Sequence, residues 1–276
     1  MTADFSVLSK FTQSNLYLEP FPHIIIEDAL SDILAEELRK TFPDAHVVGS
    51  DNSKNNERWS YCAADALGDE RVSQVWRSMI DYHTSSDFWS DVQLAFGSLL
   101  DANITRPRNL GCLGAGARVG TRGRDDFESH DILLEAQISG NTPTTSPTSV
   151  RRTHLDEGNK IFSGLFYLRD ENDKSRGGEL IIQRWKRWIP DNFKSRLYFE
   201  GMQDVVEVVK RVPYRHNTLI IFLDSINALH AVSTRHATSF TRKFMNLDGI
   251  LPVHEYELPQ PNLLAKVRRK ATIKRI

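Results

Sequence analysis

The second half of the chain alternates short β-rich runs with turns, and this alternation constrains the fold more than any other feature. The runs are 131–138, 160–168, 179–182, 205–214, 217–223 and 240–247. They are short for helices, rich in β-branched and aromatic residues, and bounded by glycine, proline or polar residues. Run 217–223 is continuously apolar from Leu219 to Leu223, which is typical of a fully buried strand. The pattern predicts a β-rich second half.

Two histidines and one carboxylate form the strongest candidate for a chemical site. His154 and Asp156 are two positions apart and point the same way if the segment is extended. His230 follows the apolar run 217–223. A His-x-Asp pair alone is weak evidence among nine histidines and 36 acidic residues, so its place among the predicted strands carries the weight. Two imidazoles and one carboxylate on one face leave coordination positions of Fe(II) open, as in non-haem oxygenases.

The order of these parts resembles the iron(II)/2-oxoglutarate-dependent dioxygenases, most closely their prolyl-hydroxylase-like branch, over roughly residues 132–248. The resemblance implies an α+β, mainly β fold: a double-stranded β-helix, jelly-roll or cupin-like, with N-terminal helices packed on the barrel. It implies that His154, Asp156 and His230 bind iron. It also implies that Arg242 binds the distal carboxylate of 2-oxoglutarate and that Tyr167 shares that contact.

The chemistry that the resemblance implies uses Fe(II), 2-oxoglutarate and O2, with ascorbate as a reductant. It releases succinate and CO2 and hydroxylates an unactivated C–H bond. Desaturation, ring closure and epimerisation use the same ligands and stay open. Asp156 favours hydroxylation over halogenation, because halogenating relatives have a small residue at this position. One segment departs from the branch: an aromatic-Pro-Gly turn is usual before the His-x-Asp pair, and this chain reads Gln137-Ile138-Ser139-Gly140.

The substrate is less constrained than the metal. A set of arginines near the predicted site favours a small polar or anionic metabolite: Arg118, Arg122, Arg124, Arg151, Arg152 and Arg184. Arg152, Gln137 and Arg184 are the candidate substrate contacts. A prolyl or other protein side chain is the alternative substrate. Two rival functions stay open, namely a non-catalytic β-helix protein that binds a ligand or partner, and an iron cupin that does not use 2-oxoglutarate.

The composition is that of an ordinary globular protein, with 276 residues, 40% hydrophobic and 26% charged. We expect one domain over 1–276, with helical support over about 1–110, a barrel core over about 130–258 and a basic tail over 262–276. A net charge of −1 gives no global field for nucleic acid or a membrane surface, so any partner preference must be local. We expect a small-molecule substrate, no membrane partner and no nucleic acid. The oligomeric state stays open, a homodimer included. No leader is visible and two cysteines are too few for a disulfide framework, which predicts a cytoplasmic protein.

The first half of the chain is predicted to support the barrel. Residues 21–27 are typical of a strand. Ser31 is the predicted N-cap of a helix that ends before Pro43 and carries the apolar residues Ile33, Leu34, Leu38 and Phe42. Two further amphipathic helices are predicted at about 70–82 and 86–102, with their tryptophans in the core.

Three segments are predicted to be loops, and a fourth has a composition of its own. Residues 48–58 form a polar loop, either a lid or a connector, and the Ser/Thr/Pro-rich stretch 139–149 is a surface loop or a mobile flap. The glycines of 111–124 lack the spacing of a dinucleotide-binding turn. Segment 183–199 interleaves aromatic and basic residues, a pattern that nucleic-acid binding uses, although the near-neutral charge argues against it.

Overall fold

The computed structural model describes residues 5–49, 54–106, 109, 113–114, 116–190, 193–194, 197–198 and 200–258. The predicted basic tail 262–276 and Cys112 therefore lie outside the described residues. Cys62 is described, half-buried, and carries a free thiol. No described helix has both the length and the apolar character needed to cross a membrane.

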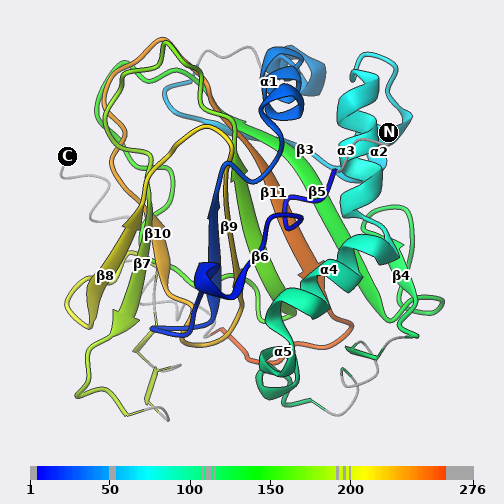
Figure 1. Cartoon of the computed structure of the whole chain (residues 1–276). Coiled ribbons are helices and arrows are strands. Elements are labelled where there is room, and N and C mark those ends of the chain that lie inside the picture. The colour runs from blue at the N-terminus through cyan, green and yellow to red at the C-terminus, as the bar shows by residue number, and fades with distance from the viewer. Residues whose placement is uncertain are drawn as a thin grey trace.

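The described strands form two sheets. The large sheet has the order β1 (Leu16–Tyr17), β2 (His23–Glu27), β9 (Thr218–Leu223), β6 (Lys160–Tyr167), β11 (Arg242–Ile250), β5 (Ile132–Asn141) and β3 (Arg58–Tyr61), and β4 (Val119–Thr121) pairs with β5. The small sheet has the order β10 (His230–Val232), β7 (Leu180–Trp185) and β8 (Val206–Val212). In Figure 1 the small sheet lies on one side of the large sheet, and helices α2 to α4 lie on the other.

The connectivity is that of a double-stranded β-helix. Between the large-sheet strands β5, β6, β9 and β11 the chain crosses to the small sheet: β7 and β8 lie between β6 and β9, and β10 lies between β9 and β11. The small sheet's first segment is reduced to one bridge, in which His154 pairs with His230. The predicted fold class is confirmed, and the closure of two sheets brings residues far apart in sequence onto one inner face.

The alternation of side chains along β11 separates two cores. The side chains of Met245 and Leu247 point away from the small sheet and pack in the core that the helices cover. Phe244 lies on the opposite face, within the core between the two sheets. Because strand residues alternate strictly, Arg242, Asn246 and Asp248 share the inner face with Phe244. Arg242, Phe244, Asn246 and Asp248 thus form a row along the inner face of β11.

The helices are α1 (Asp32–Lys40), α2 (Ala63–Gly68), α3 (Gln74–His83), α4 (Ser86–Phe96) and α5 (Ser98–Asn103), with 3₁₀ turns at Gln13–Asn15 and Ala45–Val48. Ser31 caps α1 as predicted, because its side chain accepts a hydrogen bond from the Leu34 backbone. Of the apolar residues of this helix, Ile33 does not pack inward, because its side chain is 84% exposed. It lies one position, and so about 100° around the helix, from the buried stripe that begins at Leu34.

Two helix predictions need correction. The predicted helix 86–102 is two helices, because Gly97 has a positive φ of 53° and breaks the chain direction between α4 and α5. The predicted helix 70–82 begins later, at Gln74, and the short helix α2 before it was not predicted. The tryptophans Trp76 and Trp89 are fully buried in the helix-covered core, as predicted.

The Ser/Thr/Pro-rich stretch 139–149 is only in part the surface loop that its composition predicts: residues 145–147 are exposed, but the first part of the stretch is not a loop at the surface. Strand β5 continues to Asn141, and Ser139, Asn141, Thr142 and Thr144 are buried. Thr144 and Thr148 form backbone bridges with Thr238 and Arg235. The hydroxyl and amide groups satisfy neighbouring backbone groups, so a polar segment can be buried without apolar residues.

The predicted loop 48–58 is described at its two ends. Val48 ends a 3₁₀ turn and Arg58 begins β3, so both ends are regular. Asn56 is buried, and its amide donates to the Thr148 carbonyl. The described part of the loop is therefore fastened to the stretch 139–149.

Candidate metal centre and co-substrate pocket

Three side chains meet at one end of the barrel, between the two sheets. Ligand atoms of His154, Asp156 and His230 all lie within 4.8 Å of one another. The Nε2 atom of His154 is 3.7 Å from Asp156 Oδ1, and the Nε2 atom of His230 is 3.7 Å from Asp156 Oδ2. These separations are too long for hydrogen bonds and short enough for one ion to contact all three groups. The structure thus brings together the three residues that the sequence singled out.

The orientation of both imidazoles is set by the backbone. The Nδ1 atom of His154 lies 2.7 Å from the Arg152 carbonyl, and that of His230 lies 2.9 Å from the Ala228 carbonyl. A carbonyl only accepts, so each Nδ1 carries the proton and each Nε2 presents its lone pair toward Asp156. This is the tautomer that a metal ligand requires.

The charge states of the three side chains also suit metal binding. Burial lowers the pKa of His154 and of His230, which favours neutral imidazoles. Burial raises the pKa of Asp156. The nearby Lys160 ammonium and the two histidines lower it by more, so the pKa of Asp156 lies below its ordinary value. Asp156 is therefore a carboxylate, and the set offers two neutral nitrogens and one negative oxygen donor.

A buried ion pair and a tyrosine hydroxyl lie next to Asp156. Lys160 Nζ lies 2.8 Å from Asp248 Oδ1 and 4.0 Å from Asp156 Oδ2. The Tyr256 hydroxyl donates to the Asp156 carbonyl at 3.0 Å. Gly158 allows Tyr256 to come this close, because a Cβ at position 158 would lie 1.8 Å from the Tyr256 carbonyl oxygen.

Arg242 lies on the same inner face, at the start of β11, and is only 2% exposed. Its Nη2 donates to the Tyr167 hydroxyl at 3.1 Å, and its Nε donates to the Gly178 carbonyl at 3.1 Å. Its guanidinium also packs 4.8 to 5.1 Å from the ring centroids of Tyr167, Tyr214 and Phe244. Among the described residues no carboxylate pairs with it. A buried guanidinium without a carboxylate is costly, so this position is suited to an anionic ligand.

The three candidate substrate contacts fall in different places. Gln137 is half-buried on the inner face and faces Asn246 across the β5–β11 ladder. Arg152 is exposed and packs over Gly201. Arg184 forms a 2.5 Å ion pair with Glu207 on the small sheet, and the two side chains are 39% and 42% exposed. Only Gln137 lies on the inner face near the row along β11.

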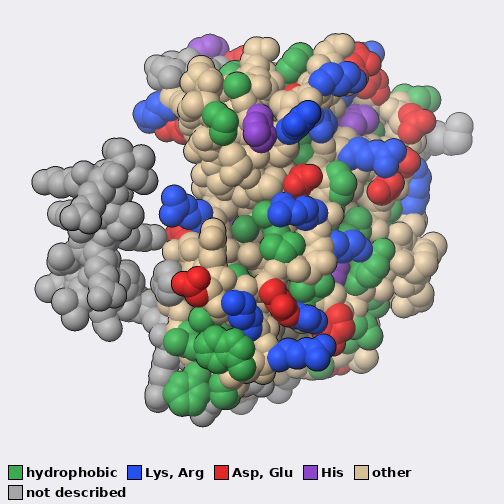
Figure 2. Space-filling view, turned by 90° about the vertical axis from the view of Figure 1, so that its left-hand side faces the viewer, with side chains coloured by type: hydrophobic (Ala, Val, Ile, Leu, Met, Phe, Trp, Pro, Cys, Tyr) green, Lys and Arg blue, Asp and Glu red, His purple; other side chains and the backbone are tan. Residues whose placement is uncertain are grey.

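Other predicted alternatives lie away from this cluster. Arg118 pairs with Asp131 at 2.9 Å beside β4, and Arg124 with Asp125 at 3.5 Å. His216 and His236 are not part of the described group of possible metal ligands. In segment 183–199, Trp185 is buried whereas Trp188 is 66% exposed. Figure 2 shows the small-sheet face, where basic and acidic side chains are intermixed and hydrophobic ones gather at the lower edge.

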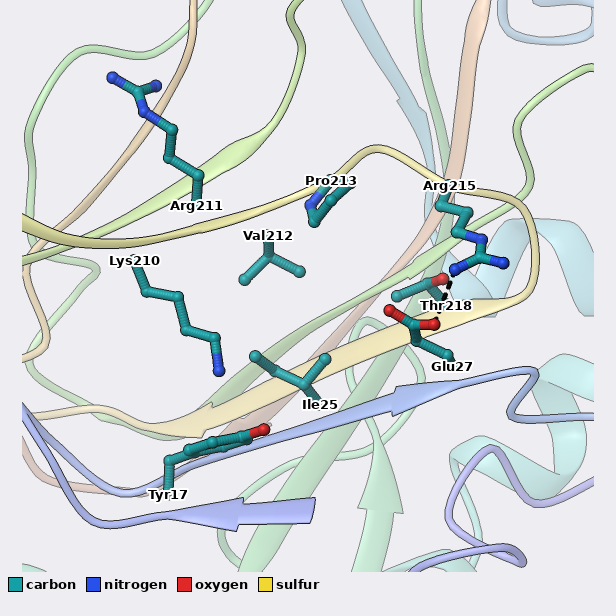
Figure 3. Close-up of a pocket in the computed structure, with 9 residues that line it drawn as sticks. All are labelled: Tyr17, Ile25, Glu27, Lys210, Arg211, Val212, Pro213, Arg215 and Thr218. Atoms are coloured by element: carbon teal, nitrogen blue, oxygen red, sulfur yellow. Dashed lines mark hydrogen bonds and ion pairs between the residues drawn. The ribbon is translucent and has the colours of Figure 1, made fainter. Parts of the chain in front are cut away.

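A separate cavity of about 230 Å³ lies between β1–β2 and the end of β8 (Figure 3). Lys210 lies over the Tyr17 ring, 3.4 Å from its centroid, and Arg215 pairs with Glu27 at 2.7 Å. None of the three clustered metal-ligand candidates lines this cavity. Its cations are engaged by an aromatic ring and a carboxylate, so the triad and not this cavity is the stronger candidate site.

Sequence reasoning missed four inner-face residues: Arg58, Lys160, Asn246 and Asp248. The alternation of β11 contained a signal for two of them, because Asn246 and Asp248 are four and six positions after Arg242 and so share its face. Arg58 had no such signal. Its strand joins the large sheet only through pairing with β5, which depends on the tertiary fold.

No protein-family model matches the chain, and no curated protein matches its sequence. Several solved structures have a similar chain arrangement. A Pseudomonas putida prolyl-4-hydroxylase is 14% identical with a TM-score of 0.41, and the match covers 84% of this chain and 93% of that one. HygX from Streptomyces hygroscopicus, solved with nickel and 2-oxoglutarate bound, is 10% identical with a TM-score of 0.43 and coverage of 88% and 89%. The Fe(II)/(alpha)ketoglutarate-dependent dioxygenase TqaL is 14% identical, with a TM-score of 0.40 and 86% coverage of each chain.

Proposed function

We propose that this protein is an Fe(II)- and 2-oxoglutarate-dependent dioxygenase that hydroxylates a C–H bond of a small polar or anionic metabolite and releases succinate and CO2. The observation that carries the proposal is the pairing of two features on one inner face. One is the cluster of His154, Asp156 and His230, and the other is the buried Arg242, which pairs with no carboxylate in the part of the chain that the structure describes.

The donor set fits Fe(II). Two neutral imidazole nitrogens and one carboxylate, all on one side of the ion, form the facial arrangement that keeps the remaining coordination positions open. The lone pairs of both Nε2 atoms face Asp156, and both Nδ1 atoms are held by carbonyls. A purely structural zinc site would surround the ion with four protein ligands, and this cluster provides three.

The second feature fits 2-oxoglutarate. Arg242 offers a planar guanidinium for a carboxylate, and the Tyr167 hydroxyl lies 3.1 Å from it and adds a hydrogen bond. A metal hydrolase or a sugar-binding cupin has no need of a buried guanidinium on this strand. Arg242 therefore favours a keto-diacid over a simple metal-bound water.

The chain's own residues then have distinct tasks. When bound, Fe(II) and 2-oxoglutarate supply the oxidising chemistry that transfers one oxygen atom of O2 to the substrate and the other to succinate. His154, Asp156 and His230 bind the metal, and Arg242 with Tyr167 orients the diacid. Apolar side chains of the core between the sheets, such as Phe222 with its ring 4.9 Å from that of His230, exclude water from the space between.

The test uses purified protein with Fe(II) and 2-oxoglutarate under anaerobic conditions. We expect 2-oxoglutarate to bind and its iron complex to give a metal-to-ligand absorption band, which His154→Ala and Asp156→Ala should abolish. His46→Ala, at an exposed surface histidine, is the matched control and should behave as wild type.

Admission of O2 and ascorbate should then give succinate, and a metabolite screen for stimulated succinate release identifies the substrate. Failure of the wild-type protein to bind 2-oxoglutarate would rule the proposal out. Binding without any succinate would favour the non-catalytic alternative, and stimulation by peptides alone would favour a protein hydroxylase.

A further inference from the structure

Arg58 is an inner-face cation that the proposed mechanism does not use. It begins β3, where its register partner is Asn141, and Asn141 in turn faces Arg242 across the β5–β11 ladder. Register partners in antiparallel strands point to the same face. The next residue, Trp59, points the other way and is buried in the helix-covered core. Arg58 therefore projects to the side of the sheet that holds Arg242 and the metal-ligand cluster.

The guanidinium of Arg58 reaches along the row of inner-face residues on β11. Its Cζ lies 5.5 Å from the centroid of the Phe244 ring, and the Cζ of Arg242 lies 4.8 Å from the same centroid. Its Nη2 is 3.4 Å from Asn246 Oδ1, two residues before Asp248. Two guanidinium groups thus contact one aromatic ring. Arg58 extends along the inner face of β11, from beside Arg242 toward Asn246 and Asp248.

Arg58 has no carboxylate of its own among the described residues. Asp248 is engaged by Lys160 at 2.8 Å and by the Asn246 amide at 2.9 Å. Asp156 belongs to the metal cluster. The hydrogen bond that Arg58 donates to Asn246 is long and its acceptor is a neutral amide. The contact is partly buried, whereas the residue as a whole is exposed. Its donors are therefore accessible to a molecule that enters beside the cluster.

The wall next to Arg58 is polar. Ser60, two residues along β3, shares a 2.8 Å hydrogen bond with Ser139 of β5. Gln137 follows on the same face of β5 and is half-buried. An apolar chain or an aliphatic ring would gain little here, because these groups would lose their access to water.

We propose that Arg58 binds the anionic group of the substrate, so that the enzyme acts on a small organic acid. The group is a carboxylate or a phosphate, both of which a guanidinium can bind through two parallel hydrogen bonds. This inference rests on the proposed function and assigns the recognition of substrate charge to a residue of β3, the last strand in the order of the large sheet.

The experiment measures succinate release by the Fe(II)-loaded enzyme with a panel of small carboxylic acids, their uncharged amides, and phosphate monoesters. We expect carboxylates or phosphates to stimulate turnover and the amides to fail. Arg58→Gln should then lower kcat/KM for the stimulating acid at least ~10-fold, mainly through KM, because a charge-assisted pair is lost. Arg58→Lys should recover part of the loss.

Arg118→Gln is the matched control, because Arg118 is an exposed arginine paired with Asp131 beside β4. It should leave all activities at wild-type values. The inference is overturned if amides stimulate as well as acids, if no acid stimulates an enzyme that binds 2-oxoglutarate, or if Arg58→Gln weakens 2-oxoglutarate binding and spares the acid. Absence of 2-oxoglutarate binding in wild type would instead reject the proposed function itself.

Discussion

His154 and His230 lie opposite each other in an antiparallel bridge, and their backbones exchange two hydrogen bonds of 2.9 and 3.1 Å. Their ring centroids are 4.1 Å apart. The bridge connects the segment before β6 to the start of β10, so the two imidazoles are held by the sheet as well as by their own carbonyl contacts. The cluster is thus preorganised by the fold, which reduces the ordering that metal binding must supply.

Arg242→Gln should weaken 2-oxoglutarate binding by about 10- to 100-fold, because the buried charge-assisted contact is replaced by a neutral one. Tyr167→Phe removes one neutral hydrogen bond and should cost less than ~10-fold. Anaerobic titration with Fe(II) present measures both affinities. Equal affinities for wild type and Arg242→Gln would show that the diacid binds elsewhere.

Gly158→Ala should disturb the metal cluster without touching a ligand. The new Cβ would lie 1.8 Å from the Tyr256 carbonyl oxygen, so the backbone that places the Tyr256 hydroxyl against Asp156 must move. We expect a lower melting temperature and weaker Fe(II) binding by calorimetry. Gly68→Ala, where a Cβ meets nothing within 4 Å, is the control and should be neutral or slightly stabilising. Indistinguishable variants would contradict the role given to Tyr256.

Lys160→Met should cost about 3 to 5 kcal/mol of unfolding free energy, because it leaves the buried Asp248 carboxylate without its cation. The double variant Lys160→Met/Asp248→Leu should recover part of that loss, since both buried charges are removed. Lys40→Met at the exposed Glu36 pair should cost less than ~1 kcal/mol. Urea unfolding of the metal-free proteins gives the comparison, and a double variant less stable than the single one would refute this account.

Because of His83, the free energy of unfolding should depend on pH. Burial lowers its pKa from 6.5 to about 4, while its Nδ1 contacts the Met79 carbonyl at 2.8 Å and its Nε2 accepts from the Val7 backbone at 3.3 Å. The unfolded chain therefore takes up a proton first. The stability that His83 gives by staying neutral in the folded chain is fully present above pH 6.5. It is lost as the pH falls toward 4, which lowers the free energy of unfolding by up to about 3 kcal/mol.

The check compares wild type with His83→Gln by urea unfolding of metal-free protein between pH 7 and pH 4. The glutamine can keep the two hydrogen bonds but does not titrate, so its stability should change less over this window. Parallel pH profiles for the two proteins would show that His83 is protonated in the folded chain as readily as in the unfolded one.

Much of the barrel followed from local pattern. The β-rich runs became β5, β6, β7, β8, β9 and β11, because period-two and fully apolar runs have few other ways to bury their side chains. Ser31 was identified as a cap for the same local reason. The helix break at Gly97 and the burial of residues 139–142 and 144 were not identified. The break depends on a positive φ, and the burial depends on hydroxyl groups that satisfy backbone groups elsewhere in the chain.

By itself, the sequence determined which residues can do chemistry: the His-x-Asp pair, a later histidine and an arginine on a strand all follow from residue type and order. Only the tertiary structure decided that these side chains share one inner face with Arg58, Lys160 and Asp248. The reason is that the register of strands far apart in the chain sets which side chains become neighbours, and that register is fixed by the burial of the whole sheet rather than by any local segment.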